Sequence, residues 1–288
     1  MAIMANIDLE NRLKKIIDLP TLPVVANNII LITQNPKSSA LEVGRAISQD
    51  QALVSRILRI ANSTFYGFPR KITTITHAIV ILGFANIRNL VVTSSILDIL
   101  PSKGRDGYFD REGFWKHSLA CGVTSKLIAN RLGIKNVEEV FIWGLLHDFG
   151  KLILDTYFNE DFAQVFRLVK EKEILIREAE EELLGFDHAM VGGRVADKWN
   201  LPPAISKVIR FHHNPPQANE SMRMVAIVHL ADVLCRAVGI GNGGDSKMPC
   251  INEDSWKLLG FNKQILKRLF SQMAREIINA KAFLRFVK

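Results

Sequence analysis

The 288-residue sequence has few cysteines, and none is paired in a way that suggests a disulfide framework or a zinc finger. Cys121, Cys235 and Cys250 are far apart and show no CxxC spacing. Cys121 and Cys235 lie within apolar helical patterns. We therefore expect reduced thiols in the core of a cytosolic protein rather than disulfides.

The sequence also lacks a long uninterrupted apolar run. Acidic residues occur within the first ten positions, so no apolar segment of a signal peptide forms there. The longest apolar stretch, residues 224–238, is interrupted by His229, Asp232 and Arg236 and is too short and polar to span a bilayer. We therefore expect a cytoplasmic protein that has no membrane partner.

Phosphate-binding loops are missing as well. There is no GxGxxG or GxxxxGK[ST] segment, and strand and helix patterns do not alternate regularly. This argues against a nucleotide-binding α/β domain. The hydrophobic content of 48% and the helical spacing of apolar residues instead predict an all-α protein.

The positive charge is concentrated near the end of the chain. The net charge is +8, and residues 251–288 hold eight Lys or Arg against three acidic residues. These basic residues alternate with Leu, Ile and Phe as on an amphipathic helix, which favours a solvated helix face over phosphate binding. No zinc-finger or RNA-recognition motif is present, so we do not expect a nucleic-acid partner.

Local signals place several helix starts. Ser39 and Glu42 form a capping-box pattern, and Asp50 is placed to cap the helix that follows it. The segment "TTITHAIVILGF" (73–84) is rich in β-branched residues, but the threonine before its apolar run and Gly83 after that run favour a helix.

Two loops suggest a division of the chain. The polar, glycine-containing stretch 101–113 separates two halves, and the glycine cluster 239–246 precedes the basic tail. We predict two helical subdomains, residues 1–105 and 106–238, followed by a basic helical extension, residues 239–288.

The second half carries polar residues within apolar helical segments. An ionised carboxylate buried without a partner is costly, whereas imidazole and carboxylate together suit divalent zinc, manganese, iron or nickel. The candidate metal ligands are His117, His147, Asp148, His188, His212, His213 and Asp232.

Adjacent residues on a helix point about 100° apart, so His147 and Asp148 can share a site only at a helix end or in an irregular turn. Gly150 makes such a turn plausible, and His212 and His213 sit at a predicted helix end. Structural roles remain open for single residues: His77 and His229 as core histidines, His213 as a helix cap, and the ion pairs Asp148–Lys151 and Asp232–Arg236.

The order of these residues resembles that of the HD superfamily of helical metal-dependent phosphohydrolases, named for its His–Asp doublet. More closely, the chain resembles an HDOD domain, the HD-related output domain of bacterial signalling proteins, over roughly residues 12–217. The matching segments are "LPTLP" (19–23), "ISQDQALVSRILRIANSTFYG" (47–67), "ITHAIVILGFANIRNLVV" (75–92), "LLHDFGKLIL" (145–154), "FDHAMVGGRVADKWNLP" (186–202) and "VIRFHH" (208–213).

The resemblance implies roles for individual residues. His117, His147, Asp148 and Asp232 fall on the basic ligand set of the superfamily. The later histidines, His188, His212 and His213, fall on additional ligands of the HD-GYP relatives, which hydrolyse cyclic di-GMP at a two- or three-metal centre. Lys151 matches a lysine near the substrate phosphate of those enzymes.

Two departures count against that activity. No GYP segment follows His213, and Gly113 stands where some relatives carry a glutamate ligand. HDOD domains are generally signalling modules, so we expect a module that acts through protein partners, with Asn62, Ser63 and Tyr66 as a candidate contact area.

The alternative is a metal-dependent phosphohydrolase or phosphodiesterase that acts on a nucleotide, a cyclic dinucleotide or another phosphate ligand at the site. It would use one or two ions, iron or manganese by ligand type. Asp148 or Asp232 would bridge the ions, and Lys151 would steady the developing negative charge.

Overall fold

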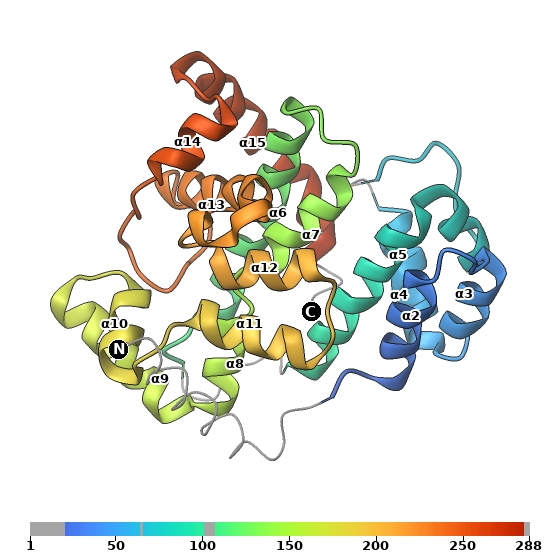
Figure 1. Cartoon of the computed structure of the whole chain (residues 1–288), viewed down its shortest axis with the longest axis horizontal. Coiled ribbons are helices and arrows are strands. Elements are labelled where there is room, and N and C mark those ends of the chain that lie inside the picture. Colours follow the sequence, from blue (N-terminus) through green and yellow to red (C-terminus); the bar gives the residue numbers. More distant parts are fainter. Residues whose placement is uncertain (1–20, 64–65, 101–106, 285–288) are drawn as a thin grey trace.

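The computed structural model describes residues 21–63, 66–100 and 107–284. These residues form helices joined by turns and loops, with no strand among them (Figure 1). The prediction of an all-α fold is confirmed. The predicted boundary between residues 105 and 106 lies outside the described residues, and the division into subdomains remains a prediction.

The first half contributes four described helices: α2 (Val24–Gln34), α3 (Ala40–Ile47), α4 (Gln51–Ala61) and α5 (Ile75–Ile99). The second half contains α6 (Arg111–Arg131), α7 (Val137–Leu146), α8 (Gly150–Tyr157), α9 (Asn159–Lys172), α10 (Ile176–Leu184), α11 (His188–Lys198), α12 (Pro203–Phe211), the 3-10 helix η1 (Pro215–Ser221) and α13 (Met222–Ala237). The helices α14 (Glu253–Leu259) and α15 (Lys263–Leu284) complete the described chain.

The predicted helix starts are confirmed. The hydroxyl of Ser39 accepts a hydrogen bond from the backbone N–H of Glu42, whose carboxylate accepts one from the backbone N–H of Ser39 at 2.7 Å. The Asp50 carboxylate accepts from Leu53 N at 2.9 Å and so begins α4. These contacts satisfy backbone N–H groups that have no partner inside the helix.

Helix α5 confirms the helical interpretation of the β-branched segment. The Thr74 side chain caps its first turn, and Gly83, with φ of 81°, breaks the helical geometry before the chain continues as helix. His77 is exposed, so its prediction as a core histidine is wrong. The inner face of this turn is formed by Ile75, Ala78 and Ile79, and His77 lies off that stripe.

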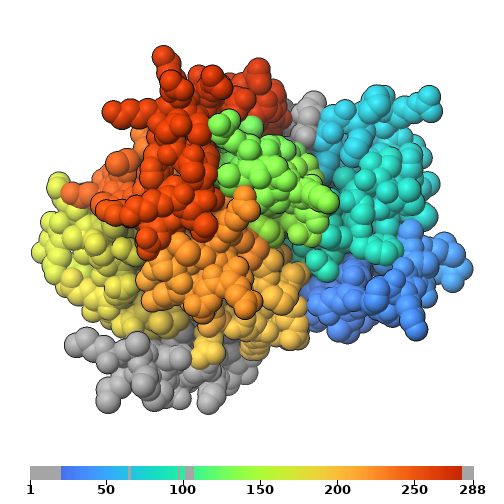
Figure 2. All heavy atoms as spheres, turned by 45° about the horizontal axis from the view of Figure 1, so that its top comes forward, coloured from blue at the N-terminus to red at the C-terminus, as the bar shows by residue number. Residues whose placement is uncertain are grey.

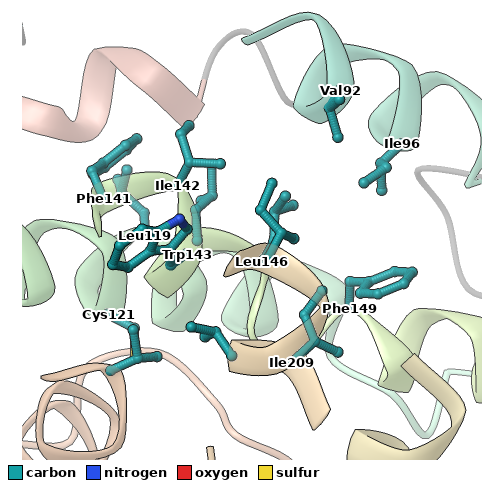
Figure 3. Close-up of a cluster of buried hydrophobic side chains, with 14 of the residues drawn as sticks. Val92, Ile96, Leu119, Cys121, Phe141, Ile142, Trp143, Leu146, Phe149 and Ile209 are labelled. Atoms are coloured by element: carbon teal, nitrogen blue, oxygen red, sulfur yellow. The ribbon is translucent and has the colours of Figure 1, made fainter. Parts of the chain in front are cut away.

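The segment Ile75–Ile96, and not residues 224–238, is long and apolar enough to cross a membrane by length and composition. Half of its apolar window is buried against the rest of the protein. Figure 3 shows Val92 and Ile96 of α5 facing the side of the core that holds Leu146 and Phe149. In the described structure α5 is therefore a core helix that joins the two halves.

Helix α15 packs against α6 (Figure 1), and Figure 2 shows the C-terminal segment, in red, beside the green segment of the chain. Its residues Leu269, Met273 and Ile277 are buried, whereas Lys267 and Arg268 are exposed. This is the amphipathic arrangement predicted from the sequence.

Helices α6 and α7 pack very closely and form the floor of the candidate site. A Cβ atom at Gly144 would lie 2.6 Å from Ser125 Oγ and 2.7 Å from the backbone oxygen of Cys121. Glycine is therefore needed here because two helix backbones approach each other. This close packing brings His117 of α6 next to His147 at the end of α7.

Candidate metal centre

The structure brings all seven predicted ligand residues together in the second half of the chain. Their ligand atoms form two groups, each within 4.8 Å. The first group is His117, Cys121, His147 and Asp232, and the second is Asp148, His188, His212 and His213. The first group also contains Cys121, which was predicted from the sequence only as a reduced thiol in the core.

The His–Asp doublet lies in a turn. Helix α7 ends at Leu146, residues 147–149 form the turn, and α8 begins at Gly150. The expectation of a helix end at the doublet is confirmed, but the reason given for Gly150 needs correction. A Cβ atom there would lie 2.0 Å from the carbonyl oxygen of His188, so glycine serves the close approach of α8 and α11.

Two histidines are held in matching orientations at helix ends. His147 Nδ1 donates to the carbonyl of Gly144 at 2.7 Å, and His212 Nδ1 donates to the carbonyl of Ile209 at 2.8 Å. Each Nε2 is then left with a free lone pair, and neither Nε2 has a hydrogen-bond partner although both side chains are fully buried. A neutral imidazole fixed in this way is a typical metal ligand.

His188 is oriented by a carboxylate. Its Nδ1 lies 2.6 Å from Glu180 Oε2, which also accepts the backbone N–H of His188 at 2.9 Å. The other ring nitrogen, Nε2, lies 2.9 Å from His213 Nε2 and 3.1 Å from Asp148 Oδ1. This carboxylate–histidine arrangement is the usual support for a metal-binding imidazole.

In the first group, His117 Nε2 lies 3.0 Å from Asp232 Oδ1 and 3.4 Å from Cys121 Sγ. His147 Nε2 lies 3.9 Å from the same Asp232 oxygen. All four side chains are buried. The group thus combines two imidazoles, a carboxylate and a thiol in the protein interior.

Asp148 lies between the two groups. Its Oδ2 is 3.4 Å from His147 Nε2, and its Oδ1 is 3.1 Å from His188 Nε2 and 3.4 Å from His212 Nε2. A carboxylate with one oxygen toward each group has the position of a bridging ligand.

Lys151 supplies the nearest positive side chain. It is 1% exposed, and its Nζ donates to Asp148 Oδ2 at 2.6 Å and to the carbonyl of Gly243 at 2.7 Å. The predicted Asp148–Lys151 ion pair is therefore present together with the histidine contacts.

The electrostatics of the centre are set by burial and by these contacts. Burial favours neutral Asp148, but His147, Lys151 and His188 outweigh it and hold the pKa of Asp148 well below its ordinary value. Burial also lowers the pKa of His147 to about 4, so its imidazole is neutral at neutral pH. Burial also lowers the pKa of His188, but the negative charge of Glu180 and the hydrogen bond with Asp148 outweigh burial and raise this pKa to about 9.

The contacts of His229 and Arg236 decide two of the structural roles that the sequence left open. His229 is buried, donates from Nδ1 to the carbonyl of His212 at 2.9 Å, and accepts the backbone N–H of Asn252 at 3.0 Å, which confirms its structural role. Arg236 forms an ion pair with Asp245 rather than with Asp232.

The donor set fits divalent metal ions. Two buried ring nitrogens without hydrogen-bond partners, His147 Nε2 and His212 Nε2, lie where ligand lone pairs are needed. Native proteins seldom leave such atoms unpaired, because each costs about 1–3 kcal/mol. Coordination of a cation by these lone pairs would remove that cost.

Sequence reasoning missed Glu180. It lies in α10 among Glu178, Glu181 and Glu182, which look equivalent in composition. One signal was available: Ile176, Glu180 and Leu184 follow one another at four-residue spacing, so Glu180 falls on the buried stripe of the helix.

A loop covers the centre. We call residues 239–247, which contain the predicted glycine cluster, the glycine loop. Asn242 N donates to the carbonyl of Gly113 at 2.9 Å, and a Cβ atom at Gly241 would lie 2.2 Å from His117 N. The loop backbone thus lies against the first turns of α6, where Gly113 replaces a glutamate of some relatives.

The glycine loop is tied down by Asp245. This fully buried carboxylate pairs with Arg236 of α13 and accepts the backbone N–H of Ile176 at 2.9 Å. A cavity of about 600 Å³ is lined by loop residues together with Tyr108, Phe166 and His117. Among the seven candidate ligands His117 lines it, so the cavity reaches the first group beside the loop.

The fold and the centre together define an all-helical protein with an HD-type cluster of histidines and aspartates. Residues 19–215 match the HDOD domain family. The chain belongs to the HDOD domain family, as the motifs of the sequence predicted.

Solved structures agree with this assignment. An HDOD domain protein of unknown function from Geobacter sulfurreducens has a TM-score of 0.81 and 29% identity, and the match covers 99% of this chain and 100% of that one. A protein from Shewanella amazonensis SB2B, named as a candidate phosphohydrolase, has a TM-score of 0.71 and 26% identity, with coverage of 94% and 97%.

A further relative is longer than this chain. An uncharacterized protein of Treponema pallidum (strain Nichols) is 26% identical over 246 residues, which covers 82% of this chain and 47% of the relative. The chain thus spans about half the length of this curated relative.

Proposed function

We propose that this protein is a cytoplasmic signal-transduction module that carries a dinuclear metal centre and acts through protein partners. The HDOD family assignment and the helical fold support a signalling role. The two ligand groups, with Asp148 between them, support two metal ions. The histidine-rich donor set favours iron or manganese over magnesium.

The position of the glycine loop is the observation that favours signalling over turnover. In hydrolytic relatives a lysine equivalent to Lys151 is expected near the substrate phosphate. Here its ammonium group is buried and donates to Gly243 and Asp148. A phosphate would have to displace the Gly243 carbonyl to reach Lys151, so the closed loop opposes substrate binding.

The first half of the chain offers a surface for protein partners. Val24, Val80 and Leu31 are 75%, 70% and 65% exposed, the highest values among the large apolar side chains of the described residues. Exposed apolar side chains mark an interface when they gather in one patch, and these three positions are where the proposal places contact with a partner.

The contact area predicted from the sequence is less favourable. The Asn62 side chain exchanges two hydrogen bonds of 2.7 Å with the backbone of Ile72, and Ser63 Oγ donates to the carbonyl of Ile60 at 2.7 Å. These bonds end α4 and stabilise the following turn. Tyr66 is half-buried.

The proposal is tested by turnover and by crosslinking. Protein loaded with iron or manganese should not hydrolyse cyclic dinucleotides or generic phosphodiesters, whereas an enzyme would turn them over at about 1 s⁻¹ or faster. A photoreactive residue at position 31 or 80 should crosslink to a discrete partner in the source cells. The same residue at Ile278, which is 63% exposed on α15, is the matched control.

The second candidate is a metal-dependent phosphohydrolase whose loop opens. The two candidate ligand groups and the Shewanella relative support it. Two metal ions would activate water and bind a phosphoryl oxygen, and Asp148 and Lys151 would then act in catalysis by holding the ions and steadying negative charge. Metal-dependent turnover that Lys151→Met abolishes would establish this function and contradict the first.

A further inference from the structure

We infer that Cys121 is a metal ligand of the first group, so that this subsite adds a thiolate to its two imidazoles, the Asp232 carboxylate and the shared carboxylate of Asp148. The inference rests on the proposed metal centre and assigns a ligand to it. It also divides the centre chemically, because the second group contains nitrogen and oxygen donors only.

The distance from Cys121 to His117 fits two ligands of one ion. Ligands bound at about 2.0–2.3 Å with tetrahedral angles lie about 3.3–3.6 Å apart. Cys121 Sγ lies 3.4 Å from His117 Nε2, which is the spacing of a sulfur and a nitrogen on one ion. Asp232 Oδ1 lies 3.0 Å from His117 Nε2 and 3.9 Å from His147 Nε2, and all four ligand atoms lie within 4.8 Å of one another.

A second observation points to an ion at this position. His147 Nε2 is fully buried, has no hydrogen-bond partner, and belongs to the same set of atoms within 4.8 Å of one another. The sulfur of Cys121 therefore lies in the same group as His147 Nε2, a nitrogen that makes no hydrogen bond.

The position of Cys121 follows from the helix. It lies four residues after His117 in α6, and residues at this spacing share one face. Gly113, where relatives supply a glutamate, lies four residues before His117 and is covered by Asn242 of the glycine loop. A ligand from the following turn thus stands in for one that the preceding turn lacks.

The alternative is that Cys121 is only a small core residue. Figure 3 shows it in the buried cluster with Leu119 and Phe141, and its backbone oxygen packs against Gly144. Cys235 provides the matched control. It is equally buried, its Sγ lies 3.4 Å from Thr124 Oγ1, and it belongs to neither ligand group. Its thiol also hydrogen-bonds the thiol of Cys121, so Cys235→Ala tests whether this neighbouring sulfur supplies the ligand instead.

Ligation has a definite chemical consequence. The metal binds the sulfur as thiolate, and the thiol proton leaves to solvent. A soft thiolate favours zinc, iron or cobalt over manganese at this subsite, whereas the second group accepts manganese more readily.

Cobalt(II) tests the inference through a thiolate-to-cobalt charge-transfer band in the near ultraviolet. The metal-free full-length protein is loaded with cobalt, and spectra and bound cobalt are measured together. The wild type and Cys235→Ala should show the band. Cys121→Ser and Cys121→Ala should lose it while far-ultraviolet circular dichroism shows the helical fold intact, and Cys121→Ser should lose about tenfold or more in zinc affinity.

The outcomes separate the two proposals. Bound cobalt without a band in the wild type, or a band that persists in Cys121→Ser, overturns the role of Cys121 and leaves the metal centre in place. Less than about a tenth of an equivalent of bound cobalt in the wild type overturns the metal centre and the ligand assignment together.

Discussion

Replacing Lys151 by methionine tests how the negative charge of Asp148 is compensated when the centre holds no metal. Methionine keeps most of the side-chain volume and removes the charge. Asp148 then loses its closest cation, 2.6 Å away, and the carbonyl of Gly243 loses its donor. Both groups are in the interior, where water cannot replace the lost contacts freely.

The size of the effect follows from burial. Removing one partner of a buried ion pair costs about 3–5 kcal/mol, because the other charge stays buried. The ring nitrogens of His188 and His212 still lie 3.1 Å and 3.4 Å from Asp148 Oδ1, and these contacts reduce the loss of stability. We therefore expect Lys151→Met to lower the free energy of unfolding of the metal-free protein by about 3 kcal/mol.

The assay is urea unfolding of chelator-treated protein, repeated with bound divalent metal. A metal ion at Asp148 replaces the missing positive charge, so the penalty should shrink by about 1 kcal/mol or more. The exposed pair Lys172–Glu182, at 2.5 Å, supplies the control, and Lys172→Met should cost less than about 1 kcal/mol. A penalty for Lys151→Met that matches the control, or one unchanged by metal, would refute the reasoning.

Three further predictions concern the support of the centre. Gly150→Ala should lower the free energy of unfolding by about 2 kcal/mol, because its Cβ would lie 2.0 Å from the carbonyl of His188; an unchanged urea midpoint would contradict this. Glu180→Gln should weaken metal binding about 10- to 100-fold in a chelator competition, since His188 loses its carboxylate partner; equal affinity would count against that orientation. Gly241→Ala, at φ of 74° and 2.2 Å from His117 N, should displace the glycine loop and speed metal removal by a chelator, and an unchanged rate would show that the loop is no cover.

Features that depend on neighbouring residues were predictable from the sequence. The Ser39–Glu42 capping box and the Asp50 cap use side chains and backbone groups three residues apart. The turn at the His–Asp doublet was predictable because two adjacent side chains cannot face one spot from the middle of a helix.

Features that depend on distant parts of the chain were not predictable in the same way. The hydrogen bond from Lys151 to Gly243 joins residues 92 positions apart, and nothing in either segment predicts the other. The role of Gly150 required knowledge that α11 crosses α8 at this point. Cys121 fits an apolar helix equally well as a core residue, so its closeness to His117 and His147 became visible only in the folded chain.

The polar residues of the centre nevertheless followed from sequence because their order is distinctive. His117, the doublet, the later histidines and Asp232 come from five separate segments, and the fold places them within two adjoining groups. Their assignment as ligands remains a prediction, which the unpaired atoms His147 Nε2 and His212 Nε2 support.

The most direct test of the central claim is metal stoichiometry. Protein purified without chelator and then supplied with iron(II), manganese or zinc should hold about two ions per chain by elemental analysis. Asp232→Ala should reduce this to about one ion, because only the first group loses a ligand, whereas Asp148→Ala should affect both. Less than about a tenth of an equivalent in the wild type after loading would contradict the account.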